Sequence, residues 1–221
     1  MPGNRRPRDE TPVEQAARIA ALGLGSRLPA GAVTELRADL RDAPDPRVRS
    51  AALGALVRVT AASTGRTACS VASRDGSSAV RRRAAELATG VADLRLARRL
   101  VAMLGDSDVT VLEAAAWALG ELGDTAVAAG AVPVLAQTAT GHHDAIAREA
   151  AVAALGALGD PAGLQAVLDA CSDKATVRRR AVLALAAFTG PGVDAAIAIA
   201  VDDRDWQVRQ AAEDLRAAGG D

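Results

Sequence analysis

The chain has 221 residues, half of them hydrophobic, which is enough to bury the core of one large domain or two small ones. Its 26 basic and 27 acidic residues give a formal charge of −1, so no global field draws the protein to nucleic acid or to a membrane. Aromatic residues make up 1% of the chain and tyrosine is absent, which disfavours ligands that need stacking surfaces, such as bases, sugars and flavins.

The N-terminal sequence MPGNRRPRDETP contains no apolar signal-peptide core, and no run of 18 apolar residues follows anywhere in the chain. We therefore expect a cytoplasmic protein that has no contact with a membrane. Cys69 and Cys171 stand far apart in alanine-rich segments, without a CxxC motif or a nearby histidine. This pattern predicts two buried thiols in a reducing compartment.

An internal repeat organises the chain, with apolar anchor residues that lie 30 to 36 positions apart. Small or apolar residues follow each anchor after four, five, seven and eight positions. At 100° per residue these positions share one face, so each segment is predicted to be an amphipathic helix of about four turns. The anchors are Val13, Val48, Val80, Val111, Ala147, Val177 and Val208.

In chain order, the first anchored helix begins at the capping box formed by Thr11, Pro12 and Glu14, so residues 1–11 are predicted to be a flexible tail. A second set of apolar helices is predicted between the anchored ones, and no segment alternates as a strand does. The helix at 206–218 is more polar than the others, which suggests a terminal capping helix and a complete solenoid. The second set of helices is predicted at 31–41, 63–73, 92–104, 126–138, 161–171 and 192–201.

The predicted fold is therefore all-α, with stacked antiparallel helix pairs that form a single solenoid over residues 12–221. Each repeat cannot bury its apolar face alone, so neighbouring repeats must stack to build a continuous core. The repeats are predicted at approximately 31–60, 61–90, 91–124, 125–160, 161–190 and 191–218.

Helix caps support this register independently of hydrophobicity. Five of the seven anchors are preceded, three positions earlier, by a side chain whose oxygen can accept a backbone N–H at the helix start. Each such cap contributes on the order of 1 kcal/mol. The fifth repeat departs from the pattern with Lys174, and Asp173 is placed to cap one residue early. The capping residues are Asp45, Ser77, Asp108, Asp144 and Asp205.

Arginine follows the anchor directly in most repeats, at Arg49, Arg81, Arg148, Arg178 and Arg209. One interpretation is a structural ladder, in which each arginine reaches the Asp cap of a neighbouring repeat from the edge of the buried face. The other is a basic stripe that binds phosphate groups, supported by the short runs 81–83 and 178–180. We favour the structural ladder, because side chains at that edge are partly occupied by packing.

The anchored consensus D-x-x-V-R-x-x-A-A-x-A-L-G-x-L-G-D resembles HEAT repeats, in particular the short bacterial type that phycobilin lyase subunits also contain. Residues 105–124 and 140–160 carry it most fully, and 45–56 and 176–188 are close to it. The resemblance implies an armadillo-like, right-handed α-solenoid superhelix of about six helix pairs. It also implies that the anchored helices line the concave face.

The position six residues after the anchor points away from the buried face on a helical wheel. It is occupied by Gly54, Glu86, Trp117, Ala153, Leu183 and Asp214. An exposed apolar strip at Trp117, Ala153 and Leu183 would be typical of a surface that anchors a partner segment. The alternative is that curvature of the solenoid buries Trp117 in the core.

Charges of both signs surround this strip, which favours a protein partner over a polyanion. The position two residues after the anchor is occupied by Ser50, Arg82, Glu113, Glu149, Arg179 and Gln210. With Glu86, Glu121 and the apolar strip, the charged members of this set form the predicted partner-binding site. We expect a protein or peptide partner and no nucleic acid, and the oligomeric state is left open.

The sequence contains few motifs of the kinds that bind metals, bind phosphates or carry out catalysis. His142 and His143 are the only histidines and lack a third metal ligand nearby, and the glycines close helices rather than open phosphate-binding loops. We therefore expect no metal, no cofactor and no catalytic residues. The His-Glu pairs that a resemblance to deoxyhypusine hydroxylase would require are missing.

One enzymatic alternative rests on Trp117 and Glu121, which lie one helical turn apart. Alkylpurine DNA glycosylases of the HEAT-like type carry a tryptophan and a carboxylate at this spacing, but their carboxylate is an aspartate and their cleft is basic and aromatic-rich. A further alternative, a chromophore lyase-like subunit, has support only from the fold. The prediction is a non-enzymatic scaffold or adaptor that binds a protein on its concave face.

Overall fold

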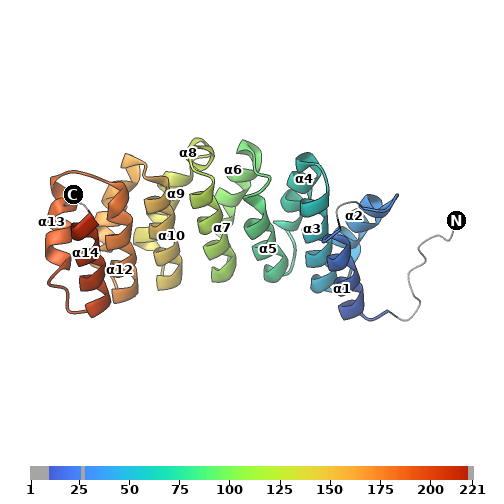
Figure 1. The fold of residues 1–221 in the computed structure, drawn as a ribbon, viewed down its shortest axis with the longest axis horizontal. Coiled ribbons are helices and arrows are strands. Elements are labelled where there is room, and N and C mark those ends of the chain that lie inside the picture. Colours follow the sequence, from blue (N-terminus) through green and yellow to red (C-terminus); the bar gives the residue numbers. More distant parts are fainter. Residues whose placement is uncertain (1–9, 26–27, 219–221) are drawn as a thin grey trace. The chain divides into compact units, whose positions relative to one another are not determined.

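The computed structural model describes residues 10–25 and 28–218. In this part of the chain there are fourteen α-helices and two short 3-10 helices, and no strand. The helices divide between two compact units, residues 1–91 and 92–221 (Figure 1). The all-α repeat architecture predicted from the sequence is confirmed, whereas most of the predicted tail, residues 1–9, lies outside the described residues.

The first unit contains two rows of helices that share a core. The anchored helix α3 packs against α1 and α5, and α2 and α4 pack against it and against each other. Val48, Leu53 and Leu56 of α3 are fully buried in this core, as the spacing from the anchor predicts. The bounds are α1 Pro12–Leu22, α2 Ala32–Asp42, α3 Pro46–Val59, α4 Ala62–Ala72 and α5 Ser78–Ala88.

The second unit repeats this arrangement. Helices α7, α10, α12 and α14 lie side by side, and α9, α11 and α13 cover one side of that row (Figure 1). Leu112 and Leu119 of α7 and Leu155 of α10 are buried between the rows. The bounds are α6 Leu94–Met103, α7 Val109–Glu121, α8 Asp124–Ala128, α9 Ala131–Gly141, α10 Ala145–Leu158, η1 Pro161–Gly163, α11 Leu164–Ala170, α12 Ala175–Ala184, η2 Leu185–Ala187, α13 Pro191–Ala200 and α14 Trp206–Ala218.

Two of the predicted second helices differ from their predicted extents. The helix expected at 126–138 is split into α8 and α9, because Gly130 adopts φ 84°, a left-handed conformation that no helix can pass through. The helix expected at 161–171 begins with a 3-10 turn at Pro161 before α11 starts. In both cases a turn residue inside the apolar pattern shortens the helix.

The predicted caps are present in most repeats. The carboxylates of Asp45, Asp108, Asp144 and Asp205 each accept the backbone N–H two residues later, at 2.8 to 3.0 Å. The Thr11–Glu14 capping box is also present. Ser77 is the exception, because its side chain makes no capping hydrogen bond and its own N–H donates to Asp75 at 2.8 Å.

Small residues bring the anchored helices of the second unit close together. A Cβ added to Gly120 of α7 would lie 3.2 Å from the Cβ of Ala157 on α10. A Cβ added to Gly156 of α10 would lie only 2.6 Å from the Cβ of Ala184 on α12. Side chains on one face of α7, α10 and α12 are therefore held on closely packed backbones.

Membrane-spanning helices are absent from residues 10–25 and 28–218, where every helix falls short of the length or the hydrophobicity that a bilayer crossing requires.

Candidate functional site

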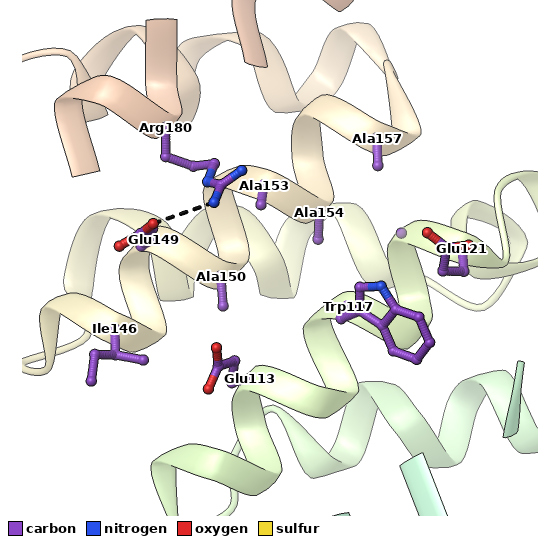
Figure 2. A pocket seen from close by; sticks show the side chains of 11 residues that line it. Glu113, Trp117, Glu121, Ile146, Glu149, Ala150, Ala153, Ala154, Ala157 and Arg180 are labelled. Atoms are coloured by element: carbon purple, nitrogen blue, oxygen red, sulfur yellow. Dashed lines mark hydrogen bonds and ion pairs between the residues drawn. The ribbon is translucent and has the colours of Figure 1, made fainter. Parts of the chain in front are cut away.

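A hollow of about 480 Å³ lies over α7 and α10 in the second unit. One face of α10, with residues at spacings of three and four, forms its floor, and Trp117 of α7 forms one wall (Figure 2). We call it the Trp117 hollow. It is lined by Glu113, Trp117, Gly120, Glu121, Ile146, Glu149, Ala150, Ala153, Ala154, Ala157 and Arg180.

A smaller hollow of about 190 Å³ adjoins it over α10 and α12 and shares Ala153, Ala157 and Arg180 with it. Leu183, whose side chain is 40% exposed, lines this second hollow. We call the two hollows together the Trp117 groove. The remaining lining residues of the second hollow are Gly156, Ala184, Ala186 and Ala187.

Trp117 is 50% exposed, so the structure supports the surface interpretation of this residue over burial in the core. The residue stands six positions after the anchor Val111, and its neighbours Ala116 and Ala118 are fully buried. The helical wheel therefore placed its side chain on the correct face of α7. Four of the six α10 residues that line the hollow are alanines, whose small side chains leave space beside the indole.

Charge in the Trp117 hollow is predominantly negative, since three glutamates face one arginine. Arg180 donates to Glu149 at 3.4 Å, and its Nε is buried without a hydrogen-bond partner among the described residues (Figure 2). Within the same part of the chain, Glu113 and Glu121 are exposed and make no hydrogen bond or ion pair through their side chains. Two carboxylates of the hollow are therefore free to meet a ligand.

The structure brings together six of the nine residues that the sequence singled out. Glu113, Glu121, Glu149, Trp117 and Ala153 line the Trp117 hollow, and Ala153 and Leu183 line its neighbour. The predicted strip of Trp117, Ala153 and Leu183 thus lies along one groove, although Arg180 stands between its two parts.

Three predicted residues lie elsewhere. Arg179 is exposed on α12 and lines neither hollow. Arg82 and Glu86 lie on α5 in the first unit, where Arg82 contacts Glu86 at 3.4 Å. In the same unit, Gly54 is buried rather than pointed to solvent, because the guanidinium of Arg58 lies over it.

Sequence reasoning missed two larger side chains of the Trp117 hollow, Ile146 and Arg180. Ile146, which is 51% exposed, stands one position before the anchor of α10, and Arg180 stands three positions after the anchor of α12. Spacings of three and four from Ile146 reach Glu149 and Ala150, so a search of the whole helical face could have found it. Arg180 comes from the adjacent repeat, and only the packing of α12 on α10 brings it to the site.

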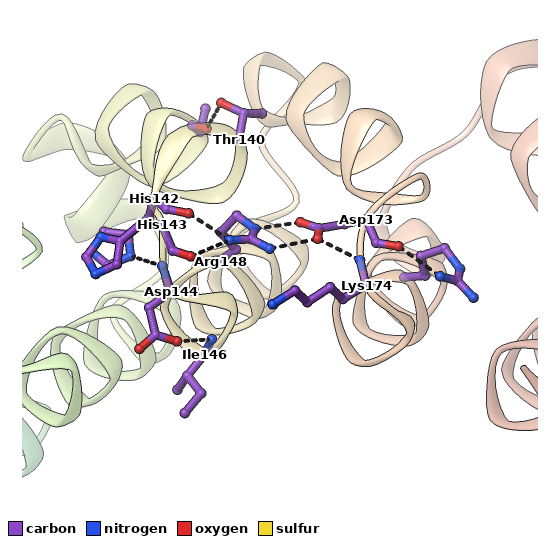
Figure 3. A network of polar contacts seen from close by, with 10 residues as sticks. Thr140, His142, His143, Asp144, Ile146, Arg148, Asp173 and Lys174 are labelled. Atoms are coloured by element: carbon purple, nitrogen blue, oxygen red, sulfur yellow. Dashed lines mark hydrogen bonds and ion pairs between the residues drawn. The ribbon is translucent and has the colours of Figure 1, made fainter.

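The arginine that follows the anchor is structural, as the ladder interpretation predicts. Arg148 pairs with Asp173 of the next repeat at 2.6 and 2.8 Å, and its Nη1 donates to the carbonyls of His142 and His143 (Figure 3). The carboxylate that pairs with the arginine belongs to a loop aspartate one or two residues before the capping position. The predicted contact with the capping residue itself was therefore wrong. The same pairing joins Arg49 to Asp75 and Arg178 to Asp203.

Contacts with acidic side chains occupy most of the arginines in the two short basic runs, whereas Arg179 is exposed. Arg178 is buried against Asp203, and Arg180 leans toward Glu149. In the first unit, Arg82 and Arg83 both pair with Glu86. Arginines that are already paired with carboxylates contribute little to the binding of a phosphate backbone, because that binding depends on the number of free cations that contact it.

The histidine and cysteine side chains form local packing and hydrogen-bond contacts. The rings of His142 and His143 stack at 4.5 Å, and the Nδ1 of His142 accepts the N–H of Asp144 (Figure 3). Among the described residues no group of three or more His, Cys, Asp and Glu side chains converges as a metal site. Burial raises the pKa of the Cys69 thiol to about 12 and that of the half-buried Cys171 to about 11, so neither thiol ionises readily at neutral pH.

Solved structures with a similar fold include an engineered protein, with a TM-score of 0.60 and 19% identity over 85% of this chain and 97% of that one. A designed armadillo repeat protein matches with a TM-score of 0.55 and 16% identity over 84% and 99% of the two chains. The complex of CpcE and CpcF of phycocyanin lyase from Nostoc sp. PCC7120 matches with a TM-score of 0.50 and 20% identity over 99% and 91%. At these identities the likeness concerns the fold alone.

No curated protein sequence matches the chain. The family model of HEAT repeats matches residues 65–137 and 132–216, which is more than half of the sequence. The residues of both hollows fall within these matched segments. With two rows of helices in each unit, repeated caps and an Asp–Arg ladder, the chain belongs to the HEAT-repeat family.

Proposed function

We propose that the protein is a non-enzymatic scaffold or adaptor that binds a protein or peptide segment in the Trp117 groove. The observation that carries the proposal is the half-exposed indole of Trp117 beside a hollow of about 480 Å³ whose floor consists mainly of alanines. A tryptophan that gains burial in a partner's pocket is a common source of binding energy. Leu183, in the adjoining hollow, offers a second apolar contact.

The rigidity of the groove supports this function. Its side chains stand on α7, α10 and α12, whose backbones approach closely at Gly120 and Gly156. Residues held on packed helices lose little conformational entropy when a partner binds. The groove can therefore convert a small contact area into affinity more efficiently than a mobile loop.

The charge of the groove favours a protein partner over nucleic acid. Trp117 and Glu121 line the same hollow, as the glycosylase alternative requires, but Glu113 and Glu149 also face it. Three carboxylates against one arginine repel a phosphate backbone. Arg148 of α10 pairs with Asp173 at 2.6 Å, so it is not a free cation for a phosphate group.

The first test is selection of a phage-displayed library of random dodecapeptides on the whole protein, followed by measurement of the Kd of enriched peptides. Trp117→Ala should weaken binding about thirtyfold, equivalent to about 2 kcal/mol, because the indole is the apolar anchor. Thermal unfolding should be nearly unchanged, since half of this side chain is already in water.

Trp206→Ala is the matched control, because Trp206 is 65% exposed and begins α14, which contributes no residue to the groove. It should leave the peptide Kd within about twofold of the wild type. Equal binding by the Trp117→Ala variant, or failure to enrich any peptide, would overturn the proposal. Binding of a DNA duplex that is lost in Trp117→Ala would favour the glycosylase alternative instead.

A further inference from the structure

We infer that the Trp117 groove selects a partner segment that carries a lysine or arginine, whose cationic head lies at the indole of Trp117 between Glu113 and Glu121. This inference rests on the proposed function and names the chemistry of the partner. It depends on the order of side chains along α7, on their freedom from internal partners, and on the alanine floor beside them.

The order of side chains places negative charge on both sides of the indole. Glu113, Trp117 and Glu121 are separated by four residues each, so they lie on one face of α7 (Figure 2). At 1.5 Å per residue, the two glutamates are roughly 6 Å from Trp117 along the helix axis, in opposite directions. A cation on the indole therefore has a carboxylate one turn away on either side.

Both carboxylates are available. Glu113 and Glu121 are exposed, and within the described residues their side chains make no hydrogen bond or ion pair. Glu149 differs, because Arg180 contacts it at 3.4 Å. The unpaired negative charge of the hollow is thus concentrated on α7, around Trp117.

A lysine or arginine can contact the indole, the two carboxylates and the alanine floor at the same time. Its head is attracted to the face of the indole by the ring quadrupole and to the carboxylates by charge. Its alkyl stem can lie on the floor formed by Ala150 and Ala154, as such stems commonly lie on apolar surface. An acidic residue would meet two unpaired carboxylates, and the single arginine of the hollow is already directed to Glu149.

An apolar side chain is expected beside the cation in the partner sequence. The adjoining hollow is lined by Leu183 and by five alanines and a glycine, with Arg180 at the boundary between the two hollows. A segment that crosses from α7 to α12 would therefore place its cation at Trp117 and an apolar residue at Leu183. The partner is a basic and apolar segment rather than a uniformly basic one.

The dodecapeptide selection described above also tests this chemistry. Most enriched sequences should contain a lysine or arginine with an apolar residue near it. The removal of two charges by Glu113→Gln together with Glu121→Gln should weaken the binding of such a peptide by tenfold or more. Replacement of the peptide's own cation by glutamine should weaken it similarly in the wild type and much less in the double variant.

Asp202→Asn together with Glu213→Gln is the matched control, since it removes two exposed negative charges that lie outside the groove. Its Kd should remain within twofold of the wild type. A Trp206→Phe background leaves Trp117 as the only tryptophan, so binding of the cation should change the Trp117 fluorescence directly.

The outcomes separate the inference from the proposed function. Enriched peptides that are acidic or uncharged, yet lose binding in Trp117→Ala, would overturn the basic partner and leave the scaffold intact. Equal binding by the double glutamine variant and the wild type would also overturn the inference. A failure to enrich any peptide that depends on Trp117 would instead overturn the proposed function itself.

Discussion

Trp117 and Trp206 are both exposed indoles, but they stand in different surroundings. Trp117 lies within a helix, with buried alanines on either side and the alanine floor of α10 before it. Trp206 is the first residue of α14. Exposure alone therefore does not mark a site. The neighbours that the adjacent repeat supplies make Trp117 the better candidate for a binding anchor.

Arginines of one cluster also differ in role, as α12 illustrates. Arg178 is buried and pairs with Asp203, Arg180 turns toward the groove, and Arg179 is exposed. The three are consecutive, so 100° rotations send them to different surfaces. Consecutive basic residues in a helix therefore do not form a basic patch on one surface.

The ladder arginine of α10 gives a stability prediction. Arg148→Ala should lower the free energy of unfolding by roughly 1 to 3 kcal/mol, because it leaves the partly buried Asp173 and two loop carbonyls without their donor. Urea unfolding followed by circular dichroism measures the change. Arg179→Ala, an exposed residue on α12, should change the free energy by less than about 0.5 kcal/mol. Equal effects of the two variants would show that the ladder does not stabilise the fold.

At the scale of elements, small residues determine how closely the anchored helices pack. Gly156 of α10 faces Ala184 of α12, where even a methyl group has no room. Gly120 of α7 faces Ala157 of α10 in a looser contact. Larger side chains at Gly120 and Gly156 would separate the helices. These two glycines therefore set the spacing of the helices that carry the groove.

Gly156→Ala tests this packing. The added Cβ would lie 2.6 Å from the Cβ and 2.8 Å from the Cα of Ala184, so the backbones must shift. We expect a loss of roughly 1 to 3 kcal/mol in the free energy of unfolding, typical of an overpacked core. Thermal and urea unfolding measure it.

Gly141→Ala is the control for the change of residue type, since nothing lies within 4 Å of the added Cβ at the end of α9. It should be neutral or stabilise the protein by up to about 1 kcal/mol, because alanine restricts the unfolded chain. A Gly156→Ala variant as stable as the Gly141→Ala variant would show that α10 and α12 can separate without cost.

At the scale of the whole molecule, the near-neutral charge conceals a local imbalance. The chain as a whole carries −1, yet the Trp117 hollow has three glutamates and one arginine. Many of the remaining charged side chains cap helices or form ion pairs of the ladder, as Arg49 does with Asp75. The charge that a partner meets is therefore decided by which residues lack an internal partner rather than by the total.

The ladder also predicts how the stability of the whole protein depends on pH. Hydrogen bonds from Arg148 and Arg178 hold the pKa of the Asp173 and Asp203 carboxyls below their usual value of 3.8. Because the folded-state pKa is lowered, this stabilisation is complete above the unfolded value and is lost as the pH falls through the folded one. The free energy of unfolding should therefore decrease below about pH 4.

Urea unfolding at a series of pH values from 7 down to 2 measures this decrease. In Arg148→Ala the decrease should be smaller, because the pKa of Asp173 is then closer to that of the unfolded chain. A steeper decrease in the variant than in the wild type, or stability that rises on acidification, would contradict the role assigned to the pair.

The sequence by itself determined the fold and the register of the repeat. The apolar positions after each anchor are buried, Asp144 and its equivalents cap the anchored helices, and Trp117 lies on the outer face of α7. These features are local, because helical periodicity and capping depend on residues within about two turns of each other.

Only the tertiary structure decided which residues form the groove. Arg180 and Leu183 reach it from α12, and the alanine floor belongs to α10, so their proximity to Trp117 depends on how closely the helices pack. The structure also decided which charges stay free, since Arg148 finds Asp173 a repeat away while Glu113 and Glu121 find no partner among the described residues. Contacts between repeats depend on helix separation and side-chain direction, which a single helical wheel does not contain.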